Sequence, residues 1–371
     1  MWDTIQKLRF RAGAGIPEAK EELDCRLHDR MELPLPGIHG ERLFLTNVSG
    51  LRKRATELTK IYESLPEHRG AQDTILLDAW SSATIEGART TVAQVKRSLS
   101  NPRTKDDRMV VNAMIAGKYA YEHPITGENI RRLWEMVTDG VCENAEQRGK
   151  LYRDGMVYIG SASRIIHIPA GVEQLPQLME HYFAFCQGNE PELLIRSFAA
   201  HFYFAYVHPF CDGNGRTARI LNASQLYHGG YRKMKSLSLS NAINNQLSGY
   251  YSSLFDSEAP LTDENGTWLD VSVFVSFMLD AFERCLIDAA LSKNTLTENE
   301  SDLLQRMNRV GVNAEITVKK AMGILERSES STRAVLNSPV QKGYLTVDTA
   351  QQPFRYCLQQ HLPNISQGNQ V

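Results

Sequence analysis

The chain has 371 residues, of which 42% are hydrophobic and 23% charged, and its formal net charge is −2. These values are typical of a folded globular protein and exclude an intrinsically disordered chain. The near balance of 41 basic and 43 acidic side chains argues against a dominant polyanion-binding surface, although it leaves room for a local basic patch.

Features of membrane, secreted and metal-stabilised proteins are weak in this sequence. No stretch is both long and apolar enough to span a membrane, and the first residues carry charges where a secretory signal needs an apolar stretch. The six cysteines are scattered without a C-x-x-C pair, which argues against a disulfide framework and a structural zinc site. We therefore expect a cytoplasmic protein with no membrane partner.

Residues 1–105 are predicted to form a helical N-terminal region. The segment Leu33–Gly37 interrupts it, because its two prolines cannot continue a helix. From Gly50 onward, apolar residues recur at three-to-four spacing, which indicates a helix. A further helix is expected over about 74–87 and ends at Gly87, since glycine suits the left-handed position after a helix.

Residues 106–291 are predicted to form a central domain. Most of it has helical periodicity, and Thr126 is placed to cap a helix. The pattern changes over 152–169, where two β-rich runs flank Gly160–Ser163 and predict a hairpin. Two strands alone are marginally stable in water, so this hairpin must rest against the helices.

A separate small unit is predicted over 297–358, after a polar stretch. Its pattern suggests three helices and a two-stranded wing. Basic and acidic residues nearly balance within it, so the unit has no strong positive surface for nucleic acid. The polar residues 359–371 are expected to form a frayed tail.

The most informative segment is HPFCDGNGRTAR, residues His208–Arg219. An apolar helix ends there, because Pro209 forbids continuation. The residues Asp212–Gly215 must turn, since glycine and asparagine tolerate positive φ angles, and a new helix then begins. The first N–H groups of that helix have no intrahelical acceptor and carry partial positive charge, so the junction predicts an anion-binding cradle.

Four side chains around this cradle suit phosphate chemistry. Arg216 and Arg219 supply guanidinium groups that match phosphate oxygens. Asp212 offers a hard oxygen ligand for Mg²⁺ carried on a nucleotide, and His208 is a base with an ordinary pKa of about 6.5. Each residue alone is more simply explained as part of a capped helix, a core histidine or a surface ion pair. A transition-metal pair of His208 and Asp212 has no evident third ligand, so the combination favours nucleotide chemistry.

This segment resembles the signature of the Fic family, H-x-F-x-[DE]-G-N-G-R-x-x-R. The matching residues are His208, Phe210, Asp212, Gly213, Asn214, Gly215, Arg216 and Arg219. The resemblance covers roughly residues 75–290 and implies a mainly α fold, with a helical Fic core and a β-hairpin flap. The C-terminal unit resembles a winged-helix-like domain. In activity, the resemblance implies transfer of AMP from ATP to a Ser, Thr or Tyr hydroxyl of a protein, with release of pyrophosphate.

The resemblance also implies roles for individual residues. His208 would be the general base, and Asp212 would hold Mg²⁺ on the α- and β-phosphates. Arg216 and Arg219 would neutralise the β- and γ-phosphates, while Phe210 would be a buried anchor. Backbone N–H groups and one asparagine side chain would cradle the phosphates, and a tyrosine would lie near the adenine. The expected ATP-binding residues are therefore Gly213, Asn214, Gly215, Arg216, Thr217, Ala218, Arg219 and Tyr251.

A second motif, Ser82-Ala-Thr-Ile-Glu-Gly87, resembles the family's inhibitory-helix signature [ST]-x-x-x-E-[GN]. A carboxylate in the last turn of a helix opposes the helix dipole, so Glu86 needs another reason to be there. The resemblance implies one: Glu86, with Ser82, would pair with Arg219 in the place of the γ-phosphate and keep ATP unproductive. It places the chain in the class with an N-terminal inhibitory helix.

The resemblance further implies partners. The hairpin would dock a target protein by main-chain strand addition, and a homodimer is compatible with the family. Two alternatives stay open. The same site could remove AMP or transfer another nucleotide, because the motif contacts phosphates rather than the base. The winged-helix-like unit could instead bind DNA while the core senses nucleotide, although the charge balance does not favour this.

Overall fold

The computed structural model describes residues 5–65, 71–142, 150–161, 164–291, 298–310, 315–341, 344–348 and 352–358. The chain divides into two compact units. The first comprises Met1–Glu57 and His68–Ala281, and the second comprises Leu58–Glu67 and Phe282–Val371. The boundary falls within two helices, α3 (Val48–Ser64) and α13 (Ser272–Leu291).

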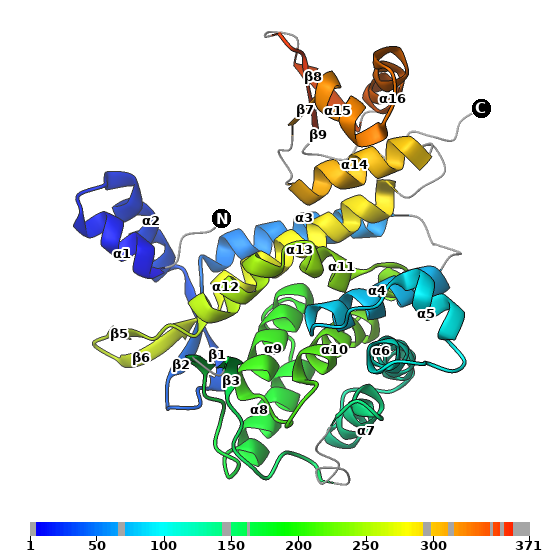
Figure 1. Ribbon diagram of the computed structural model, residues 1–371. Helices are drawn as coiled ribbons and strands as arrows, with labels where there is room; N and C mark the ends of the chain where they lie inside the picture. Colours follow the sequence, from blue (N-terminus) through cyan, green and yellow to red (C-terminus); the bar gives the residue numbers. More distant parts are fainter. Residues whose placement is uncertain are drawn as a thin grey trace. The chain divides into compact units, whose positions relative to one another are not determined.

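The first unit is mainly helical (Figure 1), which confirms the predicted fold class. Besides parts of α3 and α13, its described helices are α1 (Ile5–Gly13), α2 (Pro17–His28), α4 (Ala71–Ile85), α5 (Val92–Ser98), α6 (Lys105–Glu122), α7 (Gly127–Thr138), α8 (Leu175–Gln187), α9 (Leu193–Val207), α10 (Asn214–His228), the 3-10 helix η2 (Arg232–Ser236), α11 (Leu239–Asn244) and α12 (Leu247–Ser257). Within the described residues, no helix combines the length and apolarity needed to cross a membrane.

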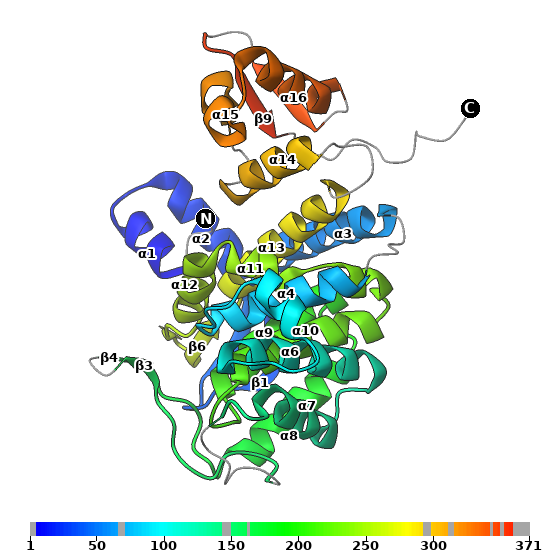
Figure 2. The same cartoon turned by 45° about the vertical axis from the view of Figure 1, so that its right-hand side comes forward.

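Helix α9 forms the centre of the first unit. It is apolar on nearly every face and almost all of its residues are buried, as expected for a helix that is hydrophobic all round. Helices α8 and α10 contact α9, and α10 also contacts α6 and α7 (Figures 1 and 2). Helix α4 contacts α6, α11 and α10. This arrangement brings α4 beside α10, the helix that begins within the segment His208–Arg219.

Local capping residues set several helix ends where the sequence predicts them. The side chain of Thr126 accepts a hydrogen bond from the backbone N–H of Asn129 at 3.2 Å and starts α7. Thr91 and Gln94 form a reciprocal capping box at the start of α5. Helix α4 ends at Ile85, and Gly87 follows with a φ of +90°, as predicted for a glycine after a helix.

The first unit also contains a four-stranded sheet, which the sequence analysis did not predict; one of its strands, Arg30–Pro36, falls where Leu33–Gly37 was expected to interrupt the helical region. Its strands β1 (Arg30–Pro36), β2 (Arg42–Thr46), β5 (Leu261–Asp263) and β6 (Gly266–Asp270) lie in the order β1-β2-β6-β5, with only the β2–β6 pair parallel. The prolines of β1 are tolerated because β1 is an edge strand. Strand β2 pairs with the neighbouring β1, but its other partner, β6, comes from a distant part of the sequence and cannot be predicted from short-range patterns.

The predicted hairpin is present and projects outward in Figure 2, while its last residue, His167, contacts α9. Strands β3 (Ile159–Ser161) and β4 (Arg164–His167) pair antiparallel. Residues 162 and 163, which belong to the predicted flap, lie outside the described residues. The first strand, Ile159–Ser161, includes Gly160 and Ser161, which the sequence places between the two strands.

The second unit has its own core and a winged-helix-like topology. Its elements follow the order α14 (Glu298–Val310), β7 (Glu315–Thr317), α15 (Val318–Leu325), α16 (Glu329–Gln341), β8 (Leu345–Asp348) and β9 (Arg355–Leu358). The sheet order is β7-β9-β8, with antiparallel pairs. Leu303, Leu336 and Tyr356 are among the buried residues of its core. The predicted helices and wing are present, β7 is an additional strand, and the predicted tail 359–371 lies outside the described residues.

Candidate active site

The segment His208–Gly213 forms a tight loop between two buried helices. Helix α9 ends at Val207, and His208 follows in a left-handed conformation with a φ of +54°. Gly213 has a φ of +74° and directly precedes Asn214, the first residue of α10. A Cβ at Gly213 would also lie 3.0 Å from Cγ2 of Thr138. Both the backbone conformation and the packing therefore require glycine at this position.

The loop is held from inside by Phe210, which is fully buried, as predicted, and stacks on Trp134 with ring centroids 5.0 Å apart. The indole N–H of Trp134 donates to the carbonyl of Asp212 at 2.7 Å. The side chain of Asn214 accepts from the N–H of Phe210 at 3.0 Å and donates to its carbonyl at 2.7 Å. The Asn214 amide thus binds the loop itself rather than facing a phosphate, which differs from its expected role.

His208 is oriented by the helix that it ends. Its Nδ1 lies 3.0 Å from the carbonyl oxygen of Ala205. Because a carbonyl can only accept, Nδ1 carries the proton and Nε2 keeps its lone pair. Burial lowers the pKa of the His208 imidazole to about 4, so the ring is neutral near pH 7. Nε2 can therefore accept a proton.

Arg153 holds the backbone around His208. Its Nε donates to the carbonyl of His208 at 2.8 Å, its Nη1 to the carbonyl of Gly155 at 3.0 Å, and its Nη2 to the carbonyl of Ala170. Its backbone N–H donates to the carbonyl of Pro209 at 2.9 Å. Burial of the guanidinium lowers the pKa of Arg153 below its ordinary value. The role of Arg153 could not be predicted from the sequence, because nothing in the neighbouring residues indicates that this arginine is buried.

Arg216 and Arg219 are both buried on the first turns of α10. Nη1 of Arg216 donates to the carbonyl of Val137 at 3.1 Å, and Nε of Arg219 donates to Oγ of Ser82 at 2.9 Å. Among the described residues, Nε of Arg216 and Nη1 of Arg219 have no hydrogen-bond partner. A buried donor without an acceptor costs about 1–3 kcal/mol, so both atoms are suited to an incoming anion.

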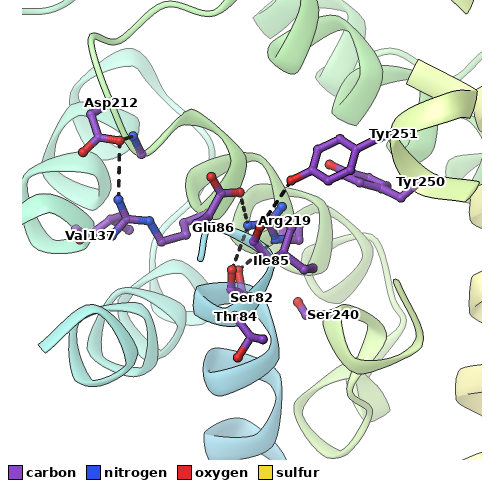
Figure 3. Close-up of polar contacts among 12 residues, drawn as sticks. Ser82, Thr84, Ile85, Glu86, Val137, Asp212, Arg219, Ser240, Tyr250 and Tyr251 are labelled. Atoms are coloured by element: carbon purple, nitrogen blue, oxygen red, sulfur yellow. Dashed lines mark hydrogen bonds and ion pairs between the residues drawn. The ribbon is translucent and has the colours of Figure 1, made fainter. Parts of the chain in front are cut away.

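Glu86 places a carboxylate at the start of α10. It directly follows the last residue of α4, and its Oε1 lies 2.7 Å from Nη2 of Arg219 (Figure 3). Nη2 of Arg219 also donates to the backbone carbonyl of Ser82 at 3.0 Å. A Cβ built on Gly215 would overlap Oε1 of Glu86, so the carboxylate lies directly over the first turn of α10. Glu86 therefore occupies the position in which the helix N-terminus would bind an anion.

The electrostatic surroundings of Glu86 favour its charged form. Burial raises the pKa of the carboxyl group, but the charge and hydrogen bond of Arg219, together with the charge of Arg216, outweigh burial. The net result is a pKa of Glu86 below its ordinary value. Its side chain is 30% exposed, whereas that of Arg219 is 2% exposed, so the ion pair lies at the rim of the buried helix end.

Comparison with known proteins agrees with this geometry. Residues 124–226 match the model of the Fic/DOC family. The chain contains a Fic domain. Glu86, Ser82 and Tyr251 lie outside the matched range. The resemblance noted from the signature is thereby confirmed.

Two curated proteins with the same name are similar to this chain in sequence. A curated protein from Drosophila grimshawi named Protein adenylyltransferase Fic is 27% identical over 297 residues, which cover 76% of this chain and 57% of the relative. A protein of the same name from Drosophila mojavensis is 27% identical over 252 residues, which cover 64% of this chain and 46% of the relative. The chain thus spans about half the length of the curated relatives that it matches.

Solved structures show the likeness of the fold. A Fic family protein from Desulfovibrio desulfuricans G20 has a TM-score of 0.56 at 20% sequence identity, covering 85% of this chain and 96% of that one. Fic-1 from C. elegans has a TM-score of 0.50 at 19% sequence identity, and the match covers 65% of this chain and 72% of that one.

Asp212, the expected Mg²⁺ ligand of the Fic domain, has a half-exposed side chain at the edge of the cradle. Its Oδ1 accepts from the N–H of Gly213 at 2.6 Å and lies 3.7 Å from Nη2 of Arg216 (Figure 3). No cluster of three or more His, Cys, Asp or Glu able to hold a metal occurs in the part of the chain that is described. A single exposed carboxylate fits an ion that arrives on a nucleotide, whose phosphates supply the other ligands.

Two neighbouring tyrosines of α12 have different environments beside the Fic domain. Tyr251 is 48% exposed, and its hydroxyl donates to the carbonyl of Ile85 at 3.2 Å (Figure 3). Tyr250 is 2% exposed, and its hydroxyl lies 3.0 Å from Nε2 of the buried His201. Of these two tyrosines, only Tyr251 thus exposes its ring to solvent, and its expected contact with the adenine stays a prediction.

Thr217 and Ala218 of the Fic domain were expected to contact ATP, and the structure places both in the packed interior. The backbone N–H of Thr217 donates to the carbonyl of Gly213 at 3.0 Å, the first helical bond of α10. Their burial fixes the helix against the core, while the open cradle is formed by the residues before them.

The flap of the Fic domain is anchored by His167. Its Nε2 lies 2.8 Å from the carbonyl oxygen of Tyr206 in α9, and its Nδ1 lies 2.8 Å from Oε2 of Glu258. These contacts give His167 a structural role. Several apolar side chains near the hairpin are 46–61% exposed: Met156, Tyr158, Ile165, Ile166 and Ile168.

Proposed function

We propose that this chain is a protein adenylyltransferase that moves AMP from ATP to a Ser, Thr or Tyr hydroxyl of a target protein. One observation carries the proposal. A carboxylate, Glu86, lies on the N-terminal turn of α10, paired with Arg219, while buried donors of Arg216 and Arg219 have no partner among the described residues. Such a site is built for an anion larger than one carboxylate, as a triphosphate is. The name of the Drosophila relatives supports the same activity.

Each of the site residues has a separate role in the proposed reaction. The hydroxyl oxygen of the target attacks the α-phosphorus, the bond to the β-phosphate oxygen breaks, and pyrophosphate leaves. Nε2 of His208 takes the hydroxyl proton, since its Nδ1 is already hydrogen-bonded to Ala205. Arg216 and Arg219 neutralise the charge on the β- and γ-phosphates. The arrangement thus acts by positioning and charge neutralisation rather than by a covalent intermediate.

Asp212 is the residue that would hold Mg²⁺ on the nucleotide. Its half-exposed carboxylate at the edge of the cradle fits such an ion. When bound, the ion would neutralise phosphate charge and orient the leaving pyrophosphate.

Glu86 would keep this site inactive. With Glu86 in place, Arg219 is already paired, and the carboxylate repels a γ-phosphate from the helix N-terminus. Loss of the Glu86 side chain would give the phosphate access to both Arg219 and the N–H groups of the first turn. This inhibition depends on α4, since Ser82 and Glu86 both come from its C-terminal end.

The flap would dock the target. Its exposed apolar side chains and its free strand edges suit an extended segment that adds as a strand. The anchoring of the hairpin by His167 and of the loop by Arg153 would align the target hydroxyl with His208. A cytoplasmic location and a homodimer stay predictions from the sequence.

The decisive experiment is intact mass spectrometry of the Glu86→Gly variant after incubation with Mg²⁺ and ATP. We expect one or more added adenylates, and a much smaller addition on the wild-type chain. Replacing ATP by UTP tests the donor, and incubation of modified protein without ATP tests AMP removal. The matched control is Glu86→Gly with His208→Ala, which keeps the cradle but lacks the base. Absence of adenylate from the single variant, together with absence of Mg·ATP binding in calorimetry, would refute the proposal.

A further inference from the structure

Helix α4 is attached to the first unit at a second point, about two turns before Glu86. The carboxylate of Asp78 accepts three hydrogen bonds from the segment that starts α11. Its Oδ1 accepts from the N–H of Ser240 at 2.8 Å and from Oγ of Ser238 at 3.2 Å, and its Oδ2 accepts from Oγ of Ser240 at 3.0 Å. Asp78 therefore ties α4 to α11 through one carboxylate.

The partners of Asp78 explain why its side chain lies at the start of α11. Ser240 lies in the first turn of α11, where a backbone N–H has no acceptor within its own helix, so the carboxylate of Asp78 supplies one. A charged acceptor near a helix N-terminus also has a favourable interaction with the helix dipole. Ser81 makes a second, longer contact with the same helix, with its Oγ 3.4 Å from Oδ1 of Asn241. Both contacts come from the part of α4 that leads to Ser82.

The apolar packing behind α4 is incomplete. A cavity of about 30 Å³ is lined by residues of α4, α6, α10 and η2, among them Ile75, Ala79, Gly117, Ile220 and Met234. Side chains that line a void lose the van der Waals contacts that they would otherwise make. A helix beside such a void is held less firmly by apolar packing. The position of α4 therefore depends more on its polar contacts than the position of a tightly packed helix does.

We infer that Asp78 is a positioning residue for inhibition, which holds α4 in the place that keeps Glu86 on Arg219. Breaking the contact of Asp78 with Ser238 and Ser240 would let α4 shift and withdraw Glu86 from the start of α10. This inference rests on the proposed function in so far as Glu86 is inhibitory. It adds that a signal acting on α11, rather than on the catalytic loop, would release the enzyme.

Two variants separate the hydrogen bonds from the shape of the side chain. Asp78→Ala removes all three acceptor contacts. Asp78→Asn is the matched control, because its oxygen can still accept from the N–H of Ser240 and from Oγ of Ser238, and its NH₂ group can donate to Oγ of Ser240. Should Asp78→Ala fail to fold, the double variant Ser238→Ala with Ser240→Ala removes the hydroxyl contacts and leaves Asp78 in place.

Two readouts are measured on the full chain. Hydrogen exchange of backbone amides in residues 79–86 should rise roughly tenfold or more in Asp78→Ala and stay near wild type in Asp78→Asn. Self-adenylylation with labelled ATP should rise by a similar factor in Asp78→Ala. In the Glu86→Gly background, Asp78→Ala should add no further activity, because the group that it positions is already gone.

The possible results are distinguishable. If Glu86→Gly gains activity but Asp78→Ala changes neither exchange nor transfer, Asp78 does not hold α4 and the inference is wrong. An equal gain from Asp78→Ala in the Glu86→Gly background also overturns it, since the effect would not act through Glu86. If exchange rises while neither variant transfers AMP, the attachment of α4 stands and the proposed function fails.

Discussion

Nη2 of Arg219 lies 2.7 Å from Oε1 of Glu86, while Nη1 of the same guanidinium has no hydrogen-bond partner in the described part of the chain. One arginine thus holds an internal carboxylate and keeps a second donor available. An internal anion that occupies only part of a site is in direct competition with a larger ligand. The predictions below test this relationship and the residues that support it.

The charge of Glu86 should control the affinity for nucleotide. Glu86→Gln keeps the size and an acceptor oxygen, whereas Glu86→Gly opens the helix N-terminus. We expect the Kd for Mg·ATP to fall roughly tenfold or more in Glu86→Gly, with Glu86→Gln intermediate, because repulsion of the γ-phosphate is lost in both. Isothermal titration calorimetry measures these constants. Equal Kd values in all three proteins would show that Glu86 does not compete with ATP.

Gly215 should be essential for phosphate binding once Glu86 is removed. A Cβ at Gly215 would occupy the place where Oε1 of Glu86 lies over the first turn of α10. Adding Gly215→Ala to Glu86→Gly should therefore weaken Mg·ATP binding about tenfold or more, since the phosphate can no longer approach the N–H groups. Binding by the double variant that matches Glu86→Gly would place the phosphates elsewhere.

The pH dependence of transfer should reflect the low pKa of His208. Burial lowers this pKa to about 4, so the base form is present throughout the neutral range and is lost only as the pH falls through about 4. Glu86 raises the pKa of His208, so its removal cannot increase it. The kcat of Glu86→Gly at saturating ATP should change less than about twofold between pH 6 and 8. A half-maximal rate near the ordinary histidine pKa of about 6.5 would contradict this.

Arg153 should affect turnover more than ATP binding. Arg153→Lys keeps a positive charge but cannot donate to the carbonyls of His208, Gly155 and Ala170 together. In the Glu86→Gly background, we expect kcat to fall roughly ten- to hundredfold as His208 loses its alignment. The KM for ATP should change less than about threefold, because the cradle on α10 is intact. Steady-state kinetics separate the two constants, and a loss confined to KM would assign Arg153 to binding.

Gly117→Ala should stabilise the first unit. Gly117 lies within α6, and a Cβ built there meets no heavy atom within 4 Å. Alanine in a helix interior is favoured over glycine by roughly 0.5–1 kcal/mol. The midpoint of denaturant unfolding, followed by circular dichroism, should therefore rise. A lower midpoint would mean that the added methyl group meets atoms near the cavity behind α4.

Much of the helical organisation follows from short-range signals. Thr126 caps its helix as expected, and Gly87 ends α4 with a positive φ. These features depend on hydrogen bonds and backbone angles within a few residues, so the local sequence is sufficient to predict them. The four-stranded sheet, in contrast, could not be predicted from short-range signals. Strand β2 pairs with β6, and nothing near residues 42–46 identifies that partner.

The turn at Pro209–Gly213 and the helix that follows could be predicted from the local sequence, and so could the expectation of an anion at their junction, because these depend on backbone geometry over a few residues. Three contacts became visible only in the folded chain: Arg153 supports His208, the Asn214 amide closes the loop, and Asp78 ties α4 to α11. The contact of Glu86 with Arg219, expected from resemblance alone, likewise exists only because α4 packs beside α10. Each of these contacts except that of Asn214 joins residues far apart in the chain, and such pairings depend on how the whole core packs.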